Sequence, residues 1–160
     1  MKKISLTAVV LGGMLAAVVF AATVTAQTED AKAAIRRAIE LKSRQALKSQ
    51  EWVIYVTPAE MVTGKKKAAP TVETDVLTFT DATLKSQNLC AQGYGESNFA
   101  LSIGDDGTAV FETMQVNQNE DLAFLRGELQ NNVIKGSMGM HPKKGAKRSF
   151  NFSTVKPEGK

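Results

Sequence analysis

From Trp52 to near the end of the chain, apolar side chains recur at every second residue in short runs. The alternating apolar positions are Trp52, Ile54, Val56, Leu77, Phe79, Phe99, Leu101, Ile103, Phe150 and Phe152. A period of two is typical of strands that bury one face and leave the other in water. This alternation predicts a series of half-buried strands, and it limits the fold more than any other feature of the sequence.

Turn-forming residues separate these runs at regular intervals. They include Pro58, Gly104–Gly107, Asn117–Asp121 and Asn131-Asn132, and they divide the region into about eight short strands. Parallel strands need long crossover connections, whereas the connections here are short. We therefore predict an all-β fold, a small up-and-down antiparallel β-barrel over residues 50–155, which leaves no open sheet edge. Residues 156–160 are expected to form a flexible tail.

One longer connection stands apart from these turns. The segment from Ala59 to Thr74 carries three consecutive lysines, Lys65 to Lys67, and Pro70. We expect it to form a mobile surface loop.

The first 26 residues have the features of an export signal. Lys2 and Lys3 precede an almost wholly apolar segment, Ile4 to Ala22, and the small residues before Gln27 suit cleavage after Ala26. We expect a signal peptide over residues 1–26 and a periplasmic or secreted mature protein without a transmembrane segment. The alternative is an uncleaved N-terminal anchor, because the apolar segment approaches the length of a spanning helix.

Residues 27–49 contain no Gly or Pro and are rich in helix-forming residues. Apolar residues recur at spacings of three and four, and Glu40 and Arg44 form a favourable i,i+4 pair. The segment predicts one amphipathic helix. Such a helix could dock on the barrel, mediate association or act as a spacer.

The distribution of charge argues against nucleic-acid binding. The helical segment carries six basic residues against three acidic ones, whereas residues 50–160 carry twelve against thirteen. A phosphate-binding surface needs clustered basic residues on the folded domain. The lysine clusters of the barrel region, Lys65 to Lys67 and Lys143 to Arg148, are expected in solvated loops.

Several spaced residues give the barrel region a resemblance to a known group. A lone Trp52 opens the first strand, Asp75, Leu77 and Phe79 mark the second, Gly127 and Gly136 interrupt two later strands, and a Phe-x-Phe pair closes the series. This pattern resembles the small exported bacterial β-barrel proteins described as lipocalin-like or calycin-like, most of which have no assigned function. The resemblance implies a ligand cavity in the barrel and Arg148 covering Trp52 from the last strand.

We predict no catalytic residues, no cofactor and no enzymatic activity, because His141 is the only histidine and no nucleophile motif is present. The residues predicted to line a ligand cavity or to fill the core are Trp52, Ile54, Leu77, Phe79, Phe99, Leu101, Phe111, Phe150 and Phe152. A weaker hypothesis is a Cu(I) site at Met138, Met140 and His141, since thioether and imidazole groups suit that ion. Period two places His141 on the opposite strand face from the methionines.

Two classes of function follow from these predictions. The first is an exported, non-enzymatic binding module for a small hydrophobic ligand held inside the barrel. The alternative is a structural or interaction protein of the cell envelope, including an enzyme inhibitor, in which the barrel is solid and the surface binds. The sequence predicts no oligomeric state, and Cys90, the only cysteine, excludes an intramolecular disulfide.

Overall fold

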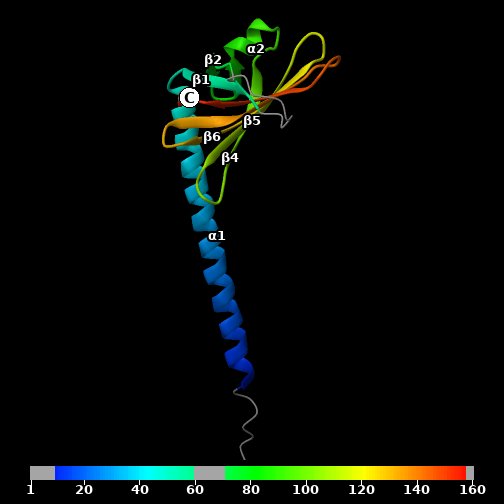
Figure 1. Ribbon diagram of the computed structural model, residues 1–160. Coiled ribbons are helices and arrows are strands. Elements are labelled where there is room, and N and C mark those ends of the chain that lie inside the picture. The colour runs from blue at the N-terminus through cyan, green and yellow to red at the C-terminus, as the bar shows by residue number, and fades with distance from the viewer. Residues whose placement is uncertain (1–9, 60–70, 158–160) are drawn as a thin grey trace, which may run out of the picture. The chain divides into compact units, whose positions relative to one another are not determined.

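The computed structural model describes residues 10–59 and 71–157, and these form two helices and eight strands (Figure 1). In chain order the elements are α1 (Val10–Lys48), β1 (Trp52–Pro58), β2 (Glu73–Phe79), β3 (Thr83–Ser86), α2 (Gln87–Ala91), β4 (Ser97–Ile103), β5 (Ala109–Val116), β6 (Leu122–Gln130), β7 (Val133–His141) and β8 (Arg148–Ser153). Each strand pairs antiparallel with the next, and β1 also pairs with β8. The sheet is therefore a closed barrel, and the predicted all-β fold is confirmed.

The turns form where residue type permits unusual backbone geometry. Asn131 and Asn132, which join β6 to β7, have φ values of 50° and 61°. Gly107, in the turn between β4 and β5, has a φ of 80°. Asn and Gly tolerate this left-handed region best, which is why the chain reverses at these positions. The register of the long strands follows from the positions of the turns.

A short helix follows β3, and the all-β prediction did not include it. The strand β3 ends at Ser86, and the chain then forms the short helix α2. Ser86 caps this helix, because its Oγ accepts a hydrogen bond from the backbone N–H of Leu89 at 3.1 Å. The all-β prediction for residues 50–155 was therefore wrong for the five residues of α2.

A buried carboxylate joins α2 to the barrel. Asp75, on β2, is only 3% exposed. Its Oδ2 accepts from Ser86 Oγ at 2.6 Å, and its Oδ1 accepts from the backbone N–H groups of Asn88 at 2.9 Å and Val76 at 2.7 Å. A carboxylate beside the first turn of a helix is favourable, and here it supplies acceptors for otherwise unpaired donors. Asp75 thereby fixes α2 against β2.

Aromatic rings fill the middle of the barrel. The ring of Phe79 meets those of Phe99 and Phe111 edge-on, at centroid distances of 5.4 Å and 5.1 Å. Gly127 on β6 pairs with Gly136 on β7, and a Cβ at Gly127 would lie within 3.0 Å of three ring atoms of Phe111. The glycines of these two strands therefore make room for phenylalanine rings inside the barrel.

The chain divides into two compact units, residues 1–38 and 39–160. Within the second unit, the last turns of α1 pack against the end of the barrel at which β1 begins. Leu47 is fully buried in the core, and the Trp52 indole Nε1–H donates to the Leu47 carbonyl oxygen at 2.8 Å. Of the three roles considered for the helix, docking on the barrel is therefore observed for its C-terminal turns.

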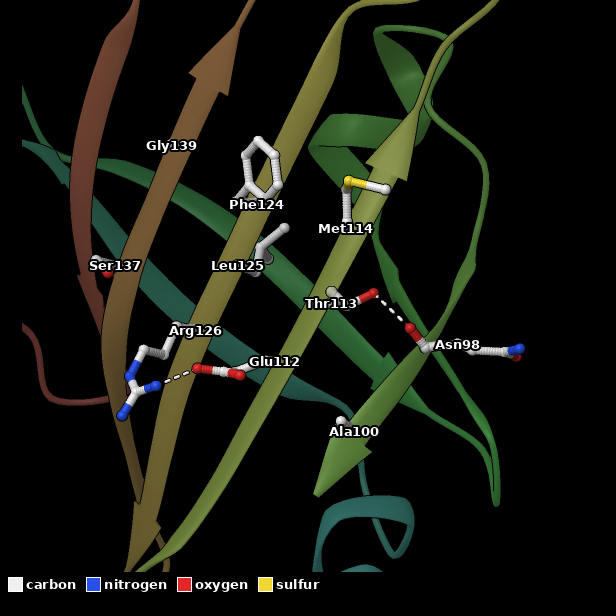
Figure 2. Close-up of a pocket in the computed structure, with 10 residues that line it drawn as sticks. All are labelled: Asn98, Ala100, Glu112, Thr113, Met114, Phe124, Leu125, Arg126, Ser137 and Gly139. Carbon is white, nitrogen blue, oxygen red and sulfur yellow. Dashed lines mark hydrogen bonds and ion pairs between the residues drawn. The ribbon is translucent and has the colours of Figure 1, made fainter. Parts of the chain in front are cut away.

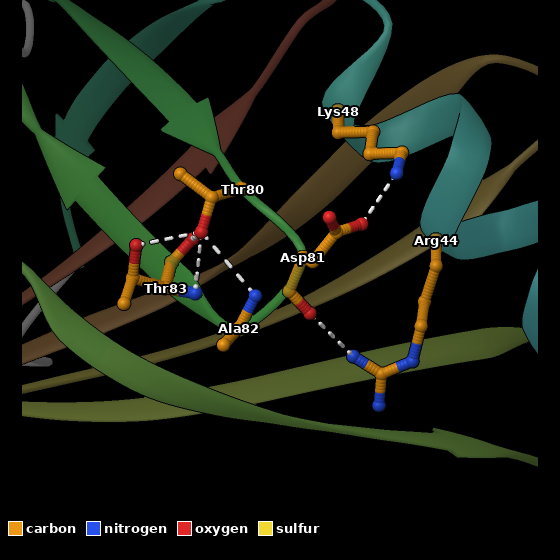
Figure 3. A network of polar contacts seen from close by, with 6 residues as sticks. All are labelled: Arg44, Lys48, Thr80, Asp81, Ala82 and Thr83. Carbon is orange, nitrogen blue, oxygen red and sulfur yellow. Dashed lines mark hydrogen bonds and ion pairs between the residues drawn. The ribbon is translucent and has the colours of Figure 1, made fainter.

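Polar contacts extend this docking to the turn between β2 and β3. Figure 3 shows Arg44 and Lys48 reaching from α1 toward Asp81. Lys48 forms an ion pair with the Asp81 carboxylate, and Arg44 Nη1 donates to the Asp81 carbonyl oxygen at 3.3 Å. The guanidinium of Arg44 also lies 5.4 Å from the centre of the Phe99 ring.

The predicted helix over residues 27–49 is observed as part of α1, which continues without a break through the predicted cleavage position after Ala26. The first nine residues of the predicted signal lie outside the described residues, as do Lys65 to Lys67 and most of the predicted loop. In the part of the chain that the structure describes, none of the helices has the length and apolar character needed to span a bilayer.

Candidate functional site: an outer groove on the barrel

The nine residues predicted to line or fill the barrel all belong to its interior. Seven of them are buried, and Leu101 and Phe150 are partly buried and pack against the others. Phe111 is fully buried beneath β6, where its ring contacts the position of Gly127. These residues therefore form much of the hydrophobic core.

Arg148 does not cover Trp52, contrary to what the resemblance implied. Trp52 begins β1, and Arg148 begins β8, which runs antiparallel to β1. The two residues consequently lie at opposite ends of the barrel. Arg148 instead places Nη2 3.6 Å from the Met140 sulfur, and its guanidinium lies 5.9 Å from the centre of the Phe150 ring.

The structure does not bring Met138, Met140 and His141 together. Met138 and Met140 belong to the inner side of β7 and line a small hollow beside α2. The His141 ring packs on the outer side, 5.1 Å from the centre of the Phe124 ring. Within residues 10–59 and 71–157, no group of three His, Cys, Asp or Glu side chains is placed to hold a metal ion.

A groove of about 570 Å³ lies on the outer surface of β4, β5, β6 and β7 (Figure 2). Its apolar part comprises the side chains of Met114 on β5 and Phe124 on β6, together with the small residues Ala100 on β4 and Gly139 on β7. The small residues on the flanking strands leave space beside the two large side chains. We name this surface the β4–β7 groove.

Strand register places the two large side chains of the β4–β7 groove side by side. Met114 pairs with Phe124 across β5 and β6, and both point outward in Figure 2. Met114 is 48% exposed and Phe124 is 38% exposed, and Val116 farther along β5 is 47% exposed. Single exposed apolar side chains are common on protein surfaces, whereas a group of them on one outer face is typical of an interaction site.

Polar groups line the same groove. Arg126 forms an ion pair with Glu112 across β6 and β5, and both side chains are more than half exposed. Thr113 Oγ1 donates to the Asn98 carbonyl oxygen at 2.7 Å, which fixes β4 against β5 at the side of the groove. An exposed ion pair adds little to stability, so its main effect here is to give one part of the groove a polar, charged border.

The turn between β5 and β6 holds Asp121, an acid whose pKa is lowered by hydrogen bonds. The backbone N–H of Lys143 donates to Asp121 Oδ1 at 2.7 Å, and Asn117 Nδ2 donates to Asp121 Oδ2 at 3.1 Å. Both hydrogen bonds hold the pKa of Asp121 below its ordinary value, and the bond from Lys143 has the larger effect. Burial, and then the nearby Asp121, raise the pKa of Tyr94. Asp121 thus links the β5–β6 and β7–β8 loops.

The chain matches no protein-family model, no curated protein and no solved structure. The resemblance to lipocalin-like barrels therefore stays a prediction. The β4–β7 groove was not among the predicted sites.

Proposed function

We propose that this protein is an exported, non-enzymatic interaction module that binds another protein through the β4–β7 groove. The observation that carries the proposal is the pair Met114 and Phe124, exposed side by side at the centre of a groove of about 570 Å³. Methionine and aromatic residues are enriched at protein interfaces, where methionine adapts its shape to the partner.

The chemistry of the groove indicates what the partner presents. A closed barrel has no free strand edge, so the partner docks through side chains rather than by adding a strand. The centre of the groove is apolar, and its border carries Glu112 and Arg126. We expect a partner segment with one or two large apolar side chains flanked by polar or charged residues.

A hydrophobic ligand inside the barrel is supported less well. Core side chains occupy the interior, and the hollow beside α2 has a volume of about 100 Å³. Sites for drug-sized ligands enclose roughly 300 to 1,000 Å³. The outer groove falls within that range, and the inner hollow falls below it.

Site-specific photo-crosslinking tests the proposal. A photoreactive amino acid replaces Met114 in one variant and Val53 in a second, each expressed with its own N-terminus in the native host. Val53 is the matched control, because it is an apolar strand residue that is 50% exposed but lies outside the groove. We expect a defined crosslinked protein from position 114 and none from position 53.

The partner identified in this way is then tested with purified proteins. Replacing both Met114 and Phe124 by Ser should weaken binding by about a hundredfold, since interface anchors contribute about 2 kcal/mol or more. Val53→Ser should leave the affinity unchanged. Equal crosslinking from both positions, or unchanged affinity of the double variant, would contradict the proposal.

A further inference from the structure

The hollow beside α2 has a volume of about 100 Å³ and lies at the end of the barrel where β2 and β8 begin. The helix α2 contributes Asn88, Leu89 and Gln92 to its lining, and the strands contribute Met138, Met140 and Phe150 among others. A water molecule occupies about 30 Å³ of liquid, so the hollow holds a molecule of only a few heavy atoms. It is separate from the β4–β7 groove.

Three charged residues line this hollow, and one of them is already fully engaged. Asp75 accepts the three hydrogen bonds that fix α2 to β2 and is almost completely buried. Its carboxylate therefore serves the fold. The charges that remain for a ligand are those of Glu73 and Arg148.

Glu73 and Arg148 both line the hollow, and both are exposed. Among the described residues, no ion pair within 4.0 Å joins the two, and neither has another charged partner. The polar contact of Arg148 is the Met140 sulfur, at 3.6 Å from Nη2. Two opposite charges thus border one small space.

The exposed guanidinium of Arg148 has two contacts beside the hollow. The Met140 sulfur and the Phe150 ring support the guanidinium from the inner wall. A guanidinium binds a carboxylate through two parallel hydrogen bonds. The same thioether and aromatic groups offer an apolar surface next to the charge.

We infer that this hollow binds a small zwitterion, an α-amino acid with a side chain no larger than that of alanine. Its carboxylate binds Arg148, and its ammonium group binds Glu73. The small volume favours small amino acids, and the thioether and phenyl groups contact the ligand's short apolar part. A simple anion would meet Glu73 without a compensating charge, and a simple cation would meet Arg148 in the same way.

Titration of the isotope-labelled protein with alanine, followed by amide NMR, tests the inference. We expect saturable shifts at the amides of α2 and of β8 near Arg148. Propionate and ethylamine each carry only one of the two charges, so each should bind at least about tenfold more weakly than alanine. Leucine should also bind more weakly, because it exceeds the volume of the hollow.

Variants test whether the charges of Arg148 and Glu73 bind alanine. Arg148→Gln and Glu73→Gln should each lower alanine affinity about tenfold or more, and Arg148→Lys should restore only part of it because the fork geometry is lost. Lys147→Gln is the matched control, since Lys147 is an exposed neighbour that does not line the hollow. Thermal unfolding of each variant confirms that it folds.

Three results would overturn the inference: propionate binding as tightly as alanine, no loss of affinity in Glu73→Gln, or no shift at the hollow at the highest soluble alanine concentration. Each of these results leaves the proposal for the β4–β7 groove untouched, because none of the varied residues lines that groove.

Discussion

The indole N–H of Trp52 donates to the carbonyl oxygen of Leu47 across the junction between α1 and β1, at 2.8 Å. Both side chains belong to the barrel core, and Leu47 is fully buried. The hydrogen bond satisfies a carbonyl at the C-terminal end of the helix, where carbonyl groups lack partners within the helix. The last turn of α1 is consequently part of the barrel domain.

This relationship predicts that Leu47→Ala destabilises the barrel. Removing a fully buried leucine side chain leaves a cavity in the core and costs about 2 to 5 kcal/mol of the free energy of unfolding. Leu41→Ala is the matched control, because Leu41 lies on the same helix and is 63% exposed. Its effect should stay within about 0.5 kcal/mol.

Urea unfolding of both variants, followed by Trp52 fluorescence, measures the difference in the free energy of unfolding. Equal stabilities of Leu47→Ala and Leu41→Ala would show that α1 does not contribute to the core.

Gly127 is predicted to tolerate no side chain. A Cβ there would overlap the buried Phe111 ring, so Gly127→Ala should lower the free energy of unfolding by about 1 to 3 kcal/mol. Gly95→Ala is the control, since a Cβ at Gly95 would meet no atom within 4 Å. The measurement is again denaturant unfolding.

A second substitution tests whether overlap with the Phe111 ring causes the loss of stability in Gly127→Ala. Phe111→Leu removes part of the ring that the new methyl group would meet, so the two changes together should cost less than the sum of the single effects. Additive effects would indicate that Phe111 is not the obstacle.

The pH dependence of stability should include a contribution from Asp121. Hydrogen bonds from Lys143 and Asn117 lower the pKa of this carboxyl in the folded protein, compared with about 3.9 in an unfolded chain. A lowered folded pKa gives stability that is present above the unfolded pKa and is lost as the pH falls through the folded pKa. Asp121→Asn should therefore reduce the loss of stability on acidification.

Chemical unfolding at a series of acidic pH values measures this slope. Lys143→Ala is the control, because it keeps the backbone N–H that makes the larger contribution and should retain most of the slope. A slope that is identical in Asp121→Asn and the unmodified protein would contradict the assignment.

The strands could be predicted from the sequence because two local signals coincide. Alternating apolar residues mark the runs, and residues such as Asn131 and Asn132 mark the reversals with their tolerance for positive φ. The helix α2 was missed for a physical reason. It spans five residues, too few for a helical period, and it is held by Asp75, which lies eleven residues before Ser86 and was assigned only to a strand.

The β4–β7 groove could not be located from the sequence, because it depends on register. The opposition of Met114 and Phe124 follows from the length of the turn at Asn117–Asp121, which a periodicity argument does not fix. One signal was available: since Phe111 is inward, period two places Met114 outward. The inward placement of Met138 and Met140, with His141 outside, did follow from period two.

We propose that the partner protein docks on the outer face of a packed barrel, and that the barrel core holds no hydrophobic ligand. Trp52, the only tryptophan, reports on the interior, where it is 3% exposed. Titrating the protein with a brominated fatty acid and recording Trp52 fluorescence tests the claim most directly, because bromine quenches only at short range. We predict no saturable quenching. Saturable quenching at one fatty acid per chain would contradict the claim and place a hydrophobic ligand inside the barrel.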